Sequence, residues 1–141
     1  MKCIRMIFCG LLTTLVLSCA TQNSHILGEG NESQLQLRQI QTKHFEISDK
    51  NFVLRSVIST MQDTGFVIDK ADDDVGVISG TKLMGRQSTI NMTVTVKLVG
   101  NTTHVRVNAR HSLDEIKDPK LYQDFFSLLS KSIFLSKNNI N

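Results

Sequence analysis

The segment 89–112 constrains the fold more than any other part of the chain. Apolar and polar residues alternate on both sides of the dipeptide Gly100-Asn101, a pattern typical of two half-buried strands joined by a two-residue turn. Such a turn pairs Val99 with Thr102, so the numbers of paired residues sum to 201. A shift of one residue would set every apolar side chain against a polar one. The sequence therefore predicts a long antiparallel hairpin with one buried face.

Two segments carry apolar side chains at the three- and four-residue spacing of amphipathic helices. The first is capped by Ser48 or Asp49 and runs to Asp63, and Gly65 follows where a left-handed backbone can end a helix. The second opens at Asp118-Pro119, with aspartate as the cap and proline in the first turn. The expected apolar stripes are Val53, Leu54, Val57, Ile58 and Met61 in the first helix, and Leu121, Tyr122, Phe125, Leu128, Leu129 and Ile133, widened by Phe126 and Phe134, in the second.

Three further strands are expected at residues 38–47, 66–70 and 75–83. In the last of them Gly76 and Gly80 fall on the same face, where bare backbone would allow a helix to approach or would mark a bulge. The element order is strand, helix, four strands, helix. This order predicts an α+β fold with a mainly antiparallel sheet, two helices on one face and the other face open to solvent.

The N-terminus has the pattern of an export signal. Lys2 and Arg5 precede an apolar run of about twelve residues, which is shorter than the about 20 residues needed to span a membrane. The run closes on Leu15-Val16-Leu17-Ser18-Cys19-Ala20, which resembles the processing site of bacterial lipoproteins. The resemblance implies removal of residues 1–18 and lipid attachment to Cys19. The alternative is an uncleaved or conventional signal with an incidental cysteine.

The cysteine and charge counts agree with a lipid-anchored chain. The three cysteines are Cys3, Cys9 and Cys19, so a mature chain beginning at Cys19 would have no disulfide and no metal site built on thiolates. Removing Lys2 and Arg5 from the 16 basic residues leaves 14 against 13 acidic ones. A charge so close to neutral gives no support to nucleic-acid binding.

The remaining domain boundaries follow from composition. Residues 19–36 are mostly polar and aperiodic after the cysteine, and we expect them to form a flexible tether. A single periplasmic domain is expected at 37–137, with a short tail at 138–141. Ala20, by resemblance to lipoprotein sorting signals, indicates the periplasmic face of the outer membrane. The cell surface and the inner membrane are the alternatives.

Several segments resemble a family of small outer-membrane lipoproteins of Gram-negative bacteria. They are the segments 41–47, 61–69, 75–82 and 122–135, and the resemblance covers nearly all of residues 37–136. It implies the lipid anchor and a single periplasmic domain, and it implies no activity. The element order is also similar to the helix-grip domains of the lipoprotein BamC, an accessory of outer-membrane barrel assembly. Fold alone does not carry function, so no site residues follow from either resemblance.

Catalytic and metal motifs are weak. Asp69 and Asp72–Asp74 lack the glycine and distal glutamate of a calcium loop, and we interpret them as a solvated turn. The four histidines lack the spacing of helical metal ligands; they are His25, His44, His104 and His111. A serine triad stays open because its members can be far apart in sequence, although no Gly-x-Ser-x-Gly elbow is present. We expect no enzyme activity, no cofactor and no metal.

The polar face of the hairpin is the candidate site. It carries Lys97, His104, Arg106 and Arg110, and no acidic residue lies on these two strands. This face is either an ordinary solvated surface or a docking surface for an acidic protein, phospholipid head groups or an anionic glycan. The main hypothesis is a non-enzymatic accessory or adaptor in an envelope complex for secretion, transport or barrel assembly. The alternative is a module that binds a lipid, glycan or small molecule, between sheet and helices or on the basic face.

Overall fold

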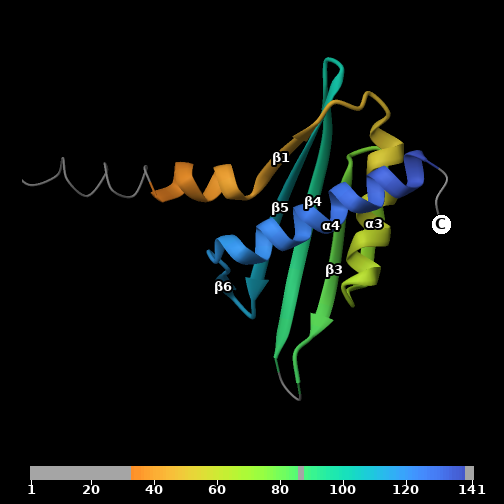
Figure 1. Cartoon of the computed structure of the whole chain (residues 1–141). Helices are drawn as coiled ribbons and strands as arrows, with labels where there is room; N and C mark the ends of the chain where they lie inside the picture. Colours follow the sequence, from red (N-terminus) through yellow and green to blue (C-terminus); the bar gives the residue numbers. More distant parts are fainter. Residues whose placement is uncertain (1–32, 86–87, 139–141) are drawn as a thin grey trace, which may run out of the picture. The chain divides into compact units, whose positions relative to one another are not determined.

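The hairpin at Gly100-Asn101 forms the middle of the sheet in the computed structural model, which describes residues 33–85 and 88–138 (Figure 1). β4 (Thr89–Val99) and β5 (Thr102–His111) pair antiparallel along their length. The paired residues sum to 201 from the turn to the far end of the hairpin. The predicted register is therefore confirmed, because the two-residue turn and the alternation of side chains specify the same pairing.

Four shorter strands complete a six-stranded antiparallel sheet in the order β1-β5-β4-β3-β2, with β6 also beside β5. They are β1 (Thr42–Phe45), β2 (Val67–Asp72), β3 (Val77–Leu83) and β6 (Asp114–Glu115). With the helices, this sheet confirms the expected α+β class. β6 was not expected, and its two residues extend the sheet where the chain turns back after β5.

The two main helices begin where their caps predict. α3 (Lys50–Asp63) is capped by Asp49, whose carboxylate accepts a hydrogen bond from the Phe52 amide at 2.9 Å. α4 (Pro119–Lys137) is capped in the same way by Asp118, which accepts from the Lys120 amide at 2.9 Å. Each carboxylate satisfies an amide that has no partner inside the helix. Both helices lie on one face of the sheet (Figure 1).

α3 ends at Asp63, and Gly65 forms the turn that follows, as expected. Gly65 has a positive φ of 86° and donates its amide to the Gln62 carbonyl at 2.9 Å. The Phe66 amide donates to the Met61 carbonyl at 2.9 Å. These two bonds satisfy carbonyls at the end of the helix, and the left-handed backbone they require favours glycine.

The hydrophobic core lies between the two helices and the inner face of the sheet. The helices contribute Val53, Leu54, Val57, Met61, Tyr122, Phe125, Phe126, Leu129 and Ile133, and the strands contribute Ile78, Met92, Val94, Val96, Val105, Val107 and Ala109. Two members of the expected α4 stripe do not join it: Leu128 is 44% exposed and Phe134 is 61% exposed. The contact stripe of α4 is narrower than predicted because the sheet covers only one side of the helix.

The first predicted strand was too long. Residues 38–40 belong to a helical segment, 33–40, and β1 holds only Thr42–Phe45 of the expected 38–47. Leu37, within this helical segment, is buried in the core, and the leucine, glutamine and arginine around it are good helix formers. The last residues of the expected tether, 33–36, are helical as well. The signal segment, Cys19 and the rest of the tether lie outside the described residues, as do residues 139–141.

The boundaries of β2 and β3 differ by one or two residues from the expected 66–70 and 75–83. Gly76 precedes β3 in a tight turn with φ 76°, and its carbonyl accepts from the Val96 amide at 2.8 Å. Gly80 lies inside β3 opposite an irregularity in β2, and a Cβ there would come within 2.9 Å of the Met61 Cε. Gly80 therefore fulfils both roles expected for glycine in this strand: it allows a helix to approach the sheet closely, and it lies opposite a bulge.

Candidate functional site

The outer face of the sheet is polar, and none of the buried core residues lies on it. On β4 and β5 its side chains are Thr89, Asn91, Thr93, Thr95, Lys97, Thr102, His104, Arg106, Asn108 and Arg110, together with the apolar Val99 beside the turn. Lys97 and Arg110 are exposed, whereas His104 and Arg106 are half-buried among their neighbours. All four predicted basic residues therefore share one face of two adjacent strands, and we call this surface the basic face.

β1 adds a residue to the basic face that the sequence did not assign. His44 pairs with His104 across the β1–β5 ladder, and the two imidazole rings stack with centroids 4.0 Å apart. Lys97 lies on the other side of His104, across the hairpin. The predicted alternation of residues 38–47 had placed Thr42 and His44 on one side, but nothing local to that segment indicated β5 as its partner.

Arg106 lies at the centre of the basic face. It is flanked by Thr42 on β1 and Thr95 on β4. Its Nε is buried without a hydrogen-bond acceptor among the described residues, an arrangement that costs about 1–3 kcal/mol. Within the described chain, no carboxylate lies within 4.0 Å of the charged atoms of Lys97, Arg106 or Arg110.

Glu115 on β6 is the ladder partner of Arg110, and its carboxylate accepts a hydrogen bond from Gln41 Nε2 at 3.1 Å. Further acidic side chains lie at the other edge of the sheet. Thr81 on β3 donates its hydroxyl to Asp69 Oδ2 at 2.7 Å and also lies 3.0 Å from Asn91 Oδ1. Lys70 and Asp72 on β2 form a loose ion pair at 3.8 Å. The outer face therefore runs from mixed charge at β2, through hydroxyl groups, to positive charge at β4 and β5.

A second candidate site is an apolar groove of about 320 Å³ on the helix-covered side of the sheet, between the end of α3, the first half of α4 and the ends of β3 and β4. Its volume falls at the lower end of the range for small-molecule sites. The lining residues are Thr64, Phe66, Lys82, Met84, Ile90, Met92, Asp118, Lys120, Leu121, Asp124, Phe125 and Leu128. We call it the apolar groove.

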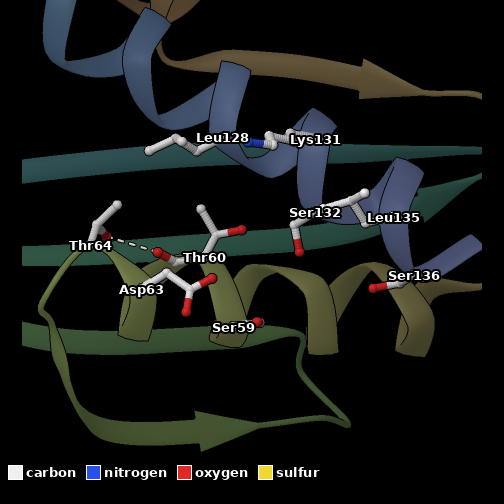
Figure 2. A pocket seen from close by; sticks show the side chains of 9 residues that line it. All are labelled: Ser59, Thr60, Asp63, Thr64, Leu128, Lys131, Ser132, Leu135 and Ser136. Carbon is white, nitrogen blue, oxygen red and sulfur yellow. Dashed lines mark hydrogen bonds between the residues drawn. The ribbon is translucent and has the colours of Figure 1, made fainter. Parts of the chain in front are cut away.

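A polar groove of about 380 Å³ adjoins it between α3 and α4, and Thr64 and Leu128 line both. Figure 2 shows the lining side chains Ser59, Thr60, Asp63, Thr64, Leu128, Lys131, Ser132, Leu135 and Ser136. The Thr60 and Thr64 hydroxyls donate to the carbonyls of Ser56 and Thr60, each at 2.8 Å. Those two hydroxyls serve the helix backbone, so this groove offers a ligand fewer free donors than its composition suggests.

The other sequence candidates are not gathered into a site. The Lys50 ammonium donates to the Asp73 carbonyl at 2.6 Å and to the Asp74 carbonyl at 3.2 Å, so a cation of the chain itself occupies the acidic turn. His111 lies within hydrogen-bonding distance of Ser88, away from the stacked pair. Over residues 33–85 and 88–138, no three side chains of the histidine, cysteine, aspartate or glutamate type gather as metal ligands. His25 is outside the described residues.

Comparison of the chain with protein-family models gives no match, and comparison with curated proteins gives none either. None of the described helices is both long and apolar enough to cross a membrane.

Proposed function

We propose that this chain is a membrane-anchored, non-enzymatic accessory protein of the cell envelope whose domain docks on an acidic protein through the basic face. One observation carries the proposal. Lys97, Arg106 and Arg110 lie on two adjacent strands without a carboxylate within 4.0 Å among the described residues. Close cations on a sheet repel one another. The carboxylates of an acidic partner would be attracted by these cations and would offset their mutual repulsion.

The residue types favour a protein carboxylate as the partner group. The planar guanidinium of Arg106 or Arg110 can bind a carboxylate through two parallel hydrogen bonds. The threonine and asparagine side chains around these arginines supply neutral hydrogen bonds at the rim of such an interface.

The anchor belongs to the same proposal. Lipid on Cys19 would hold the domain at the periplasmic face of the outer membrane, with the cell surface or the inner membrane as alternatives. Metabolic labelling with a palmitate analogue tests it: we expect the wild-type chain to be labelled and the Cys19→Ala chain to be unlabelled. Equal labelling of the two chains would contradict the anchor.

The docking test is crosslinking in cells followed by mass spectrometry. The variant Arg106→Glu/Arg110→Glu reverses two charges on the basic face. Its matched control is Arg38→Glu/Arg55→Glu, which makes the same change at exposed helical positions. We expect one crosslinked envelope protein with an acidic surface to be lost in the first variant and kept in the control. Recovery of abundant lipoproteins alone, or the same loss in both variants, would count against docking through this face.

A further inference from the structure

Lys82 occupies a position on β3 that faces the helices. Gly80 and Ile78, two and four residues earlier, are buried on that side of the sheet, and alternation places Lys82 on the same side. A charged side chain pointing toward a core needs a partner or contact with water, because its desolvation is costly. Lys82 is half-buried and lines the apolar groove with Phe66 and Leu121.

The Lys82 ammonium lies near the end of α3. Nζ is 5.9 Å from the centroid of the Phe66 ring, a distance at which a cation is attracted by an aromatic face. Its Cε would lie 3.7 Å from a Cβ at Gly65. The position of the ammonium is therefore limited on one side by the turn that ends α3, and its other side faces the groove.

The carboxylates of the groove are already engaged. Asp124 accepts a hydrogen bond from Lys120 Nζ at 2.6 Å, and Asp118 accepts from the Lys120 amide as the cap of α4. Lys82 has no carboxylate within 4.0 Å among the described residues. The groove consequently holds one cation whose charge is not compensated by an ion pair.

The rest of the lining is apolar and partly exposed. Met84 is 47% exposed and Leu128 is 44% exposed at this groove, although both side chains are as hydrophobic as those of the core. Methionine side chains such as Met84 and Met92 adapt to irregular apolar shapes. Exposed apolar surface around a hollow of this volume is typical of a ligand site.

We infer that the apolar groove binds a single-chain amphiphile with one carboxylate, such as a fatty acid. The carboxylate pairs with Lys82 Nζ, and the tail lies among Met84, Met92, Leu121 and Leu128. The volume of about 320 Å³ suits such a chain. This site lies on the opposite side of the sheet from the basic face, so it neither requires nor excludes docking there.

A photoreactive dodecanoate tests the inference on the full chain held in nanodiscs of zwitterionic phospholipid. After irradiation, peptide mapping should find the label on the segments 82–92 and 118–128. Unlabelled dodecanoate should compete for this labelling, whereas dodecyltrimethylammonium, which has the same tail and the opposite charge, should not. Labelling spread over the chain, or equal competition by both amphiphiles, would overturn the inference.

Variants identify the role of the charge. Lys82→Gln removes the charge and shortens the side chain by one atom. It should weaken competition by dodecanoate about tenfold, the effect of losing one hydrogen bond between charged groups. Lys131→Gln is the matched control, because this lysine lines the adjoining polar groove and its loss should leave competition unchanged. Leu128→Asp should abolish labelling by introducing a carboxylate beside the tail. Labelling at the wild-type level in both Lys82→Gln and Leu128→Asp would exclude the site.

Discussion

His44 on β1 stacks on His104 on β5, with ring centroids 4.0 Å apart and ring planes inclined by 22°. The two residues are 60 positions apart in the sequence and are direct partners in the β1–β5 ladder. β1 is only four residues long and pairs with no strand other than β5 among the described residues. The stacked rings therefore join a short edge strand to the basic face.

A double-mutant cycle measures this contact. We expect His44→Ala and His104→Ala to be coupled in the free energy of unfolding by about 0.5–1 kcal/mol, the usual contribution of a stacked cross-strand pair. Urea unfolding of the wild type, the two single variants and the double variant gives the coupling. The control cycle of His44→Ala with His111→Ala should give a value near zero, and equal coupling in both cycles would contradict a direct contact.

Gly76 should tolerate no side chain. A Cβ there would lie 2.2 Å from the Val96 carbonyl oxygen, and the backbone has φ 76°. We expect Gly76→Ala to cost more than about 3 kcal/mol of stability, because the clash adds to the strain of a left-handed residue. Gly100→Ala is the control, since Gly100 has φ 61° but no atom within 4 Å of its Cβ position. Gly100→Ala should cost only about 1 kcal/mol. If thermal unfolding showed similar losses of stability for Gly76→Ala and Gly100→Ala, a clash at Gly76 would be excluded.

Gln41 connects three parts of the domain from a buried position, with 1% of its surface exposed. Its Nε2 donates to Glu115 Oε1 at 3.1 Å and lies 3.3 Å from the Tyr122 hydroxyl. Gln41→Leu should cost about 1–3 kcal/mol because it removes the hydrogen bond to Glu115 and the contact with the buried Tyr122 hydroxyl. Gln41→Glu should cost more, since it brings a second carboxylate against Glu115. Gln39→Leu, at an exposed position, is the control in urea unfolding and should change stability little.

Lys120 gives a prediction about pH. The hydrogen bond and the charge of Asp124 raise the pKa of Lys120 above its ordinary value of 10.5. Because the folded pKa is the higher one, the pair stabilises the folded chain below the ordinary lysine pKa, and this contribution is lost as pH rises through the raised pKa. Asp124→Asn should therefore lower the pKa of Lys120, measured by NMR titration of its side chain. An unchanged titration would show that the pair does not form in solution.

Local sequence determined the elements that depend on neighbouring residues. The turn at Gly100-Asn101 and the alternation around it specify the register of β4 and β5, and Asp49, Asp118 and Gly65 mark the ends of helices through their own backbone contacts. These features could be predicted because a cap or a two-residue turn acts within a few residues of chain. The same locality explains the error at 38–47, where a short apolar pattern fits a strand or a helix equally well.

Lipid attachment at Cys19 and the location at the outer membrane remain predictions from the sequence. The amino-acid sequence by itself determined an α+β domain, its hairpin register and a row of four basic residues on one face of the hairpin. Only the tertiary structure decided that His44 joins that row, that Lys82 faces an apolar groove, and that Leu128 is exposed beside it. The physical reason is that these arrangements depend on contacts between β1 and β5, and between α4 and the sheet. The residues involved are dozens of positions apart, and no local pattern specifies which surfaces meet.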